Sequence, residues 1–128
     1  MKTYLGLGLA MLAGVAVGAT GVSGLRAQAK PPGYVIIDIT EITNHDAFQK
    51  EVLTKGPASV TAGGGRFLIR NDKITPTDGS PPARFVVIAF DNLEKALAWD
   101  KSAAQQEVNK LRLQTTKSRQ FIIEGVSN

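Results

Sequence analysis

Residues 34–40 read Tyr-Val-Ile-Ile-Asp-Ile-Thr, a run rich in β-branched side chains that is typical of a β-strand. Side chains alternate between the two faces of a strand. One face of this strand is wholly apolar, with Val35, Ile37 and Ile39, and we expect it to pack against helices. The other face carries Tyr34 and Asp38 and is still largely apolar. The stretch therefore predicts a sheet that is covered on both faces.

Three further strands are predicted outward from this one. They are expected at residues 66–70, 85–90 and 119–124, where β-branched and aromatic residues gather. With the helices between them, the order is β-α-β-β-α-β, which is the α+β ferredoxin-like pattern. Helices cover only one face of such a sheet. A second copy of the sheet is the simplest cover for the other face, so we expect a homodimer.

Two helical regions connect these strands. The first begins after a cap at Thr43 or Asn44 and is expected to be interrupted at Gly56-Pro57, with a second piece over residues 57–61. The second is expected to begin at a capping box that starts with Asp91 and to break and restart at Ser102.

The first 29 residues have the three parts of a secretory signal. Lys2 supplies the positive charge, an uncharged stretch rich in Leu, Ala, Val and Gly follows, and Ala27-Gln28-Ala29 is a small-x-small cleavage motif. We therefore expect cleavage after Ala29, a single mature domain over residues 30–128, a periplasmic or secreted location and no membrane association. The uncharged stretch is also long enough to span a bilayer, so an uncleaved inner-membrane anchor is the alternative.

Composition and charge exclude several classes of function. The leader holds Lys2 and Arg26 out of 15 basic residues and none of the 11 acidic ones, so the mature chain has 13 basic and 11 acidic residues and a net charge of +2. Nucleic-acid binding needs a clustered basic surface and is not expected. The absence of cysteine and the presence of one histidine exclude thiol catalysis and multi-histidine metal sites. We expect no metal and no cofactor.

Several short motifs occur in a characteristic order along residues 34–126. They are Tyr34-Val35-Ile36, Gly64-Gly65-Arg66-Phe67-Leu68, Pro81-Pro82-x-Arg84 leading into residues 86–88, Leu93-Glu94-Lys95-Ala96, Ala98-Trp99 with Ser102, and residues 121–125. In this order and spacing they resemble the bacterial family called domain of unknown function 1330 (DUF1330). The resemblance implies ferredoxin-like subunits that pack sheet to sheet as a dimeric α/β barrel. The family has no established general activity.

Three places depart from the family's pattern. Gly63 stands where members often have an aromatic residue or histidine, and Asp100 stands where many have Tyr or Phe. Residues 102–105 read Ser-Ala-Ala-Gln where many members have Ser-Pro-Glu-Tyr. If those aromatic residues line a pocket in the family, the pocket of this chain is different.

Four residues are candidate ligand-binding groups: Asp38, His45, Arg70 and Trp99. Strict alternation over residues 66–70 places Arg70 on the barrel side of the sheet, the same side as Asp38. Because buried charges need partners, Asp38 and Arg70 are expected either to pair with each other or to bind a polar ligand.

The other two candidates each have a plainer interpretation. His45 lies where the first helix begins, so it is either an exposed first-turn residue or a general base. Trp99 lies near the apolar stripe of a helix, so it either packs in the core or lines a ligand pocket between helix and sheet.

These observations predict an exported homodimer that binds a small organic molecule. Two alternatives stay open. One is a cofactor-independent oxygenase or isomerase that acts on a small organic substrate, as relatives of this fold do. The other is a structural or stress-related dimer with no ligand.

Overall fold

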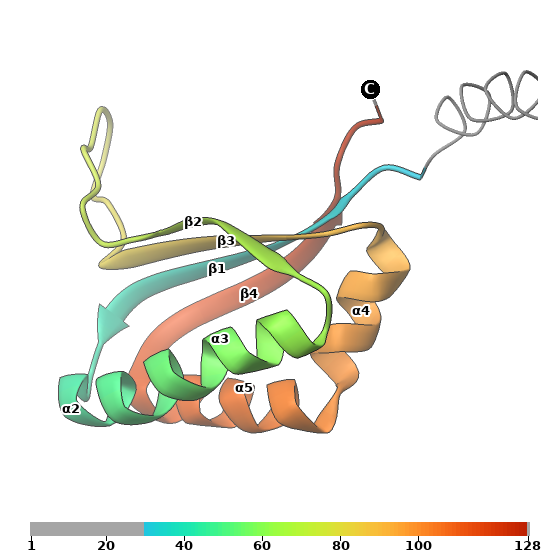
Figure 1. The fold of residues 1–128 in the computed structure, drawn as a ribbon. Coiled ribbons are helices and arrows are strands. Elements are labelled where there is room, and N and C mark those ends of the chain that lie inside the picture. Colours follow the sequence, from blue (N-terminus) through green and yellow to red (C-terminus); the bar gives the residue numbers. More distant parts are fainter. Residues whose placement is uncertain (1–29, 128) are drawn as a thin grey trace, which may run out of the picture. The chain divides into compact units, whose positions relative to one another are not determined.

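A computed structural model describes residues 30–127, which form a four-stranded antiparallel sheet with helices on one face (Figure 1). The strands are β1 (Gly33–Ile42), β2 (Arg66–Asn71), β3 (Arg84–Phe90) and β4 (Thr116–Glu124), and their order in the sheet is β2-β3-β1-β4. The helical segments are α2 (His45–Ala47), η1 (Phe48–Val52), α3 (Leu53–Ala62), α4 (Leu93–Lys101) and α5 (Ala103–Thr115).

The predicted β-α-β-β-α-β order and the ferredoxin-like α+β fold are confirmed. β4 begins three residues before the predicted strand. The predicted signal sequence, residues 1–29, lies outside the described residues. Within residues 30–127, no helix is both long enough and apolar enough to cross a membrane.

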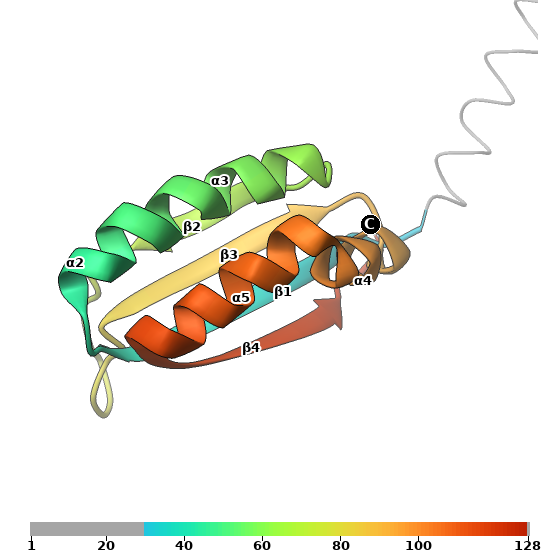
Figure 2. The same cartoon turned by 90° about the horizontal axis from the view of Figure 1, so that it is seen from below.

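The core lies between the sheet and the helices, with α3 over the β2 edge and α5 over the side that ends in β4 (Figure 2). Alternation along β1 is as predicted: Val35, Ile37 and Ile39 are buried in this core. From β3, Val86, Ile88 and Phe90 join them, and from the helices Phe48, Val52, Val60, Ala96, Trp99 and Val108.

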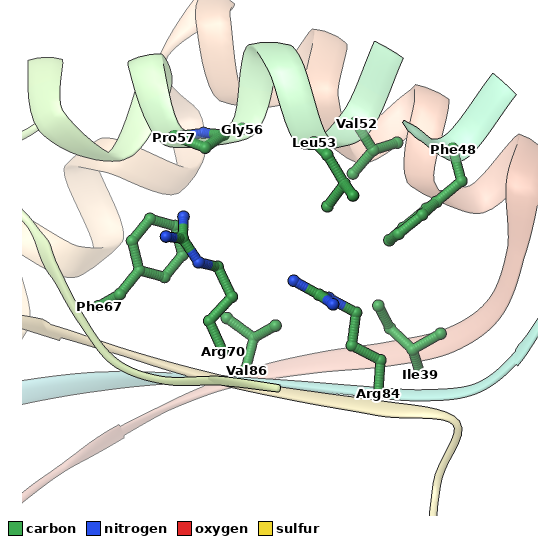
Figure 3. A pocket seen from close by; sticks show the side chains of 10 residues that line it. All are labelled: Ile39, Phe48, Val52, Leu53, Gly56, Pro57, Phe67, Arg70, Arg84 and Val86. Carbon is green, nitrogen blue, oxygen red and sulfur yellow. The ribbon is translucent and has the colours of Figure 1, made fainter. Parts of the chain in front are cut away.

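The strand β2 departs from the predicted alternation. Its pairing with β3 shifts register between Phe67 and Ile69, so the strand carries a β-bulge with one extra residue there. As a result, Phe67 and Arg70 both point toward the helices (Figure 3). The prediction that Arg70 shares a face of the sheet with Asp38 is therefore wrong.

The predicted interruption of the first helical region at Gly56-Pro57 is wrong, because α3 continues through Pro57 to Ala62. Proline lacks an amide hydrogen, and its ring crowds the carbonyl one turn earlier. Here that carbonyl belongs to Leu53, at the junction where the π-helical turn η1 gives way to α3. Pro57 therefore meets the end of a widened turn rather than the middle of a regular α-helix.

Polar side chains set the start of the last two helices. The amide of Lys95 donates to Oδ1 of Asn92 at 2.9 Å, so Asn92 caps α4 and the predicted cap at Asp91 is wrong by one residue. Asp91 instead forms an ion pair with Nζ of Lys95 at 3.2 Å. The predicted break at Ser102 is confirmed, since its Oγ accepts from the amide of Gln105 and caps α5.

Candidate functional site

A cleft of about 540 Å³ opens between the sheet and the first helical region (Figure 3). Its lining residues are Ile39, Phe48, Val52, Leu53, Gly56, Pro57, Phe67, Arg70, Arg84 and Val86. Most of this lining is apolar, and the volume lies in the range of small-molecule sites. The cleft is therefore the candidate functional site of the domain.

The helical wall of the cleft takes its shape from the π turn. Phe48 and Val52, at the two ends of η1, are both buried and both face the cleft. Gly56 and Pro57 follow in α3 and also line the cleft, and Gly56 has no side chain to fill it (Figure 3). π-Helical turns of this kind occur frequently at functional sites.

Two arginine side chains reach into the cleft from the sheet. Arg70 comes from β2 and Arg84 from β3, and both guanidinium groups extend toward the helical wall (Figure 3). The guanidinium carbon of Arg70 lies 4.3 Å from the centre of the Phe67 ring, a cation–π contact that holds it in place. Within residues 30–127, neither arginine has a carboxylate partner. Arg70 is exposed and Arg84 is half-buried, so both guanidinium groups can be reached from solvent, and two positive charges at one cleft attract an anion.

The structure places Asp38 on the opposite face of the sheet from Arg70. Its carboxylate accepts from Nε of Arg119 at 3.0 Å, across the β1–β4 pairing. Asp38 also lines a second hollow of about 520 Å³ with Ile69 and Phe85. The expected pairing of Asp38 with Arg70 is therefore replaced by pairing with Arg119.

The structure does not bring His45 or Trp99 into the cleft. His45 is exposed at the first position of α2. Trp99 is 3% exposed, its indole N–H donates to Oγ of Ser59 at 3.2 Å, and its ring lies 5.2 Å from that of Phe90. Both positions agree with the plainer interpretations, an exposed first-turn residue and a core tryptophan.

Sequence reasoning missed Arg84 as a site residue. The sequence does contain the relevant pattern. Arg84 lies two residues before Val86 and four before Ile88, so alternation along the strand puts it on the same face as these two apolar residues, which is the face toward the helices. It missed Phe48 and Phe67 for a different reason: an aromatic residue in a cleft wall and one in a core have the same pattern in the sequence.

A polar cluster lies on the other side of the same helix–sheet layer, between α5 and β4. We call it the Arg112 cluster, and it comprises Asp100, Asn109, Arg112, Ser118 and Gln120. Arg112 is 6% exposed and donates from Nη1 to Oγ of Ser118 at 2.7 Å. The Asp100 carboxylate accepts from Asn109 and Gln120 at 3.0 and 2.8 Å. Burial lowers the pKa of Arg112, and the charge of Asp100 opposes that shift.

The chain matches the family described as domain of unknown function (DUF1330) over residues 32–126. No curated protein matches it. In the part of the chain that the structure describes, no group of three or more His, Cys, Asp or Glu side chains could hold a metal ion.

Three solved structures illustrate the fold. A protein of unknown function from Rhodopseudomonas palustris has 14% identity and a TM-score of 0.54, over 85% of this chain and 94% of that one. An ethyl tert-butyl ether d (ethd) family protein from Bacillus halodurans has 14% identity and a TM-score of 0.56, over 74% and 99%. SnoaB, a cofactor-independent oxygenase from Streptomyces nogalater, has 11% identity and a TM-score of 0.53, over 77% and 96%. At these identities the likeness shows the fold alone.

Proposed function

This chain belongs to the DUF1330 family, and we propose that it is an exported homodimer that binds a small organic molecule between its sheet and its helices. The observation that carries the proposal is the cleft of about 540 Å³, with apolar walls and two arginines that have no carboxylate partner within residues 30–127. A mostly apolar hollow with a few convergent polar groups is the usual form of a ligand site.

Thermal shift tests the binding proposal on protein purified after expression of the full chain. A panel of small aromatic and aliphatic compounds, both neutral and anionic, should include members that raise the melting temperature, because a ligand of the native state stabilises it. Leu53→Trp fills the cleft and should abolish the shift. Leu97→Trp, at a 42% exposed position of α4, is the matched control and should keep it. No shift with any compound, or an unchanged shift in Leu53→Trp, contradicts the proposal.

The homodimer is proposed from the open face of the sheet. That face carries exposed apolar side chains on both edge strands, with Ile69 on β2 and Phe121 and Ile123 on β4. Large apolar side chains exposed on a sheet face that no helix covers are typical of an interaction surface. A second copy of the sheet would cover it, and it would leave the clefts on the outer, helix-covered faces.

Light scattering tests the assembly. The wild-type protein should have twice the mass of one chain at micromolar concentration, and Phe121→Glu should give a monomer because it places a charge in the apolar face. Leu113→Glu is the control, since Leu113 is equally apolar and 61% exposed but lies on α5. A wild-type monomer overturns this part of the proposal, as does a Phe121→Glu dimer.

Export is proposed from the sequence of residues 1–29. N-terminal sequencing of the exported protein should begin at Lys30. Recovery of the whole chain in the membrane fraction, with Met1 or Lys2 retained, would instead support the anchored alternative.

A second candidate function is a cofactor-independent oxygenase, which the likeness to SnoaB brings into consideration. The cleft lining favours binding, because it contains no His, Asp, Glu, Lys or Tyr that could act as a general base. Oxygen consumption with each compound that binds separates the two: the binding proposal expects none above the rate without protein.

A further inference from the structure

We propose that the molecule held in this cleft is an organic acid, with a flat apolar body and a carboxylate bound by Arg70 and Arg84. The inference rests on the proposed binding function and adds to it the chemical class of the ligand.

The chain supplies no carboxylate to the two cleft arginines within residues 30–127, and Arg70 is exposed while Arg84 is half-buried. No carboxylate lines the cleft, and no acidic residue precedes Asp38, so the leader has no acidic side chain to offer either. A partner subunit on the open face would lie on the other side of the sheet from Arg70 and Arg84. Solvent can compensate their charge in the free protein, and an anionic ligand that enters the cleft can take its place.

The arrangement of the two arginines suits one carboxylate. Arg70 pairs with Val86 across the β2–β3 ladder, so Arg84, two residues before Val86 on the same face, is its diagonal neighbour. Diagonal neighbours on adjacent strands lie about 7–8 Å apart, within reach of long side chains. Guanidinium groups bind carboxylates through paired N–H donors, and the stacking of Arg70 on Phe67 holds one of them in position.

The remaining walls favour an apolar body. Phe48 and Leu53 face it from the helical side and Phe67 from the sheet (Figure 3). Aromatic side chains on opposite walls pack well against a flat ring. Naphthalene carrying one carboxylate combines both features, so 2-naphthoate is a suitable probe, and 2-naphthamide is its neutral counterpart of nearly equal shape.

Calorimetric titration of both probes tests the inference, with protein purified after expression of the full chain. Wild-type protein should bind 2-naphthoate at least about tenfold more tightly than 2-naphthamide, as expected for hydrogen bonds to a charged group. Arg70→Gln and Arg84→Gln should each weaken naphthoate binding about tenfold and leave naphthamide binding unchanged. Arg66→Gln removes the same charge from an exposed position of β2 outside the cleft lining and should change either affinity less than about twofold.

The outcomes separate the two levels of the argument. Equal binding of naphthoate and naphthamide, both lost in Leu53→Trp, would keep the binding function and overturn the preference for an acid. Naphthoate binding that survives both arginine substitutions would also overturn it. If neither probe binds at millimolar concentration and no compound shifts the melting temperature, both proposals fall.

Discussion

Arginines enter the helix–sheet layer of this domain at two places, and their surroundings differ. Arg112 on α5 is 6% exposed and hydrogen-bonds to Ser118, with the Asp100 carboxylate close enough to affect its pKa. Arg70 and Arg84 face the cleft without a carboxylate partner in the described part of the chain. Arg112 is buried and held by hydrogen bonds from its terminal nitrogens, although its Nε has no partner within residues 30–127, whereas Arg70 is exposed and Arg84 is half-buried. The buried arginine is therefore part of the packed layer near β4, and the two that solvent reaches near β2 are those that we propose bind a ligand.

The largest expected effect is the loss of stability when the buried Arg112 is replaced. Arg112→Ala should lower the free energy of unfolding by about 3 kcal/mol, because it leaves a gap in a buried layer and takes a cation from the surroundings of Asp100. Urea denaturation measures this. Arg66→Ala, at an exposed position, is the control and should stay within about 0.5 kcal/mol of wild type. An Arg112→Ala loss as small as that of the control would remove the contrast between the two places.

A second effect should appear where the end of α3 meets Trp99. A Cβ atom on Gly63 would lie 2.5 Å from Cδ1 of Trp99, which is fixed by Ser59 and by the Phe90 ring. Gly63→Ala should therefore destabilise the domain by about 2 kcal/mol, as overpacking does in well-packed cores. Because the chain has one tryptophan, its fluorescence reports the displaced ring directly. Wild-type stability and fluorescence in this variant would show that the packing around Trp99 can adjust to the added methyl group.

The strands β1 and β2 also differ in how well the sequence predicts which way their side chains point. Alternation on β1 gives the correct faces because that strand is regular over residues 33–39. Alternation on β2 fails after Phe67, because the bulge shifts every later side chain to the other face. A bulge depends on how β2 pairs with β3, which no local pattern records. The error moved Arg70 to the wrong side and gave Asp38 the wrong partner.

The candidate site was predicted in part for the same reason. Arg70 is a predicted candidate and lines the cleft, but strict alternation places its side chain on the barrel side of the sheet, which is the wrong face. The interruption expected at Pro57 came from a local rule, and it missed the π turn η1, which depends on how Phe48 and Val52 pack. The faces of a regular strand depend on local pattern and can be derived from the sequence, and the start of α4 can be derived to within one residue. The cleft is made by two irregular elements, a bulge and a π turn, and both depend on tertiary contacts.

The cleft wall should respond to an added methyl group less strongly than the packing around Gly63 does. Apart from its neighbours in the chain, a Cβ atom on Gly56 would meet Cγ1 of Val108 at 3.9 Å, which is an ordinary packing distance. Gly56→Ala should change the free energy of unfolding by less than about 1 kcal/mol, because the gain from replacing a glycine inside a helix is opposed by crowding of the new Cβ against the ring of Pro57. Urea denaturation of this variant and of Gly63→Ala compares two Gly→Ala changes in or next to one helix. An equally large loss in both would mean that the first helical region is packed tightly along its whole length.

The smallest expected effect is the most informative about the two groups of arginines. Arg84→Gln should change the free energy of unfolding by less than about 0.5 kcal/mol, since Arg84 has no ion pair among the residues that the structure describes. Any change should be a gain, because Arg70 then has one like charge fewer nearby, and that gain should shrink at high salt, where exposed charges are screened. Denaturation at low and high salt measures both. A loss comparable to that of Arg112→Ala would mean that Arg84 already has a partner within the folded protein, and the argument that its charge is left for a ligand would fail.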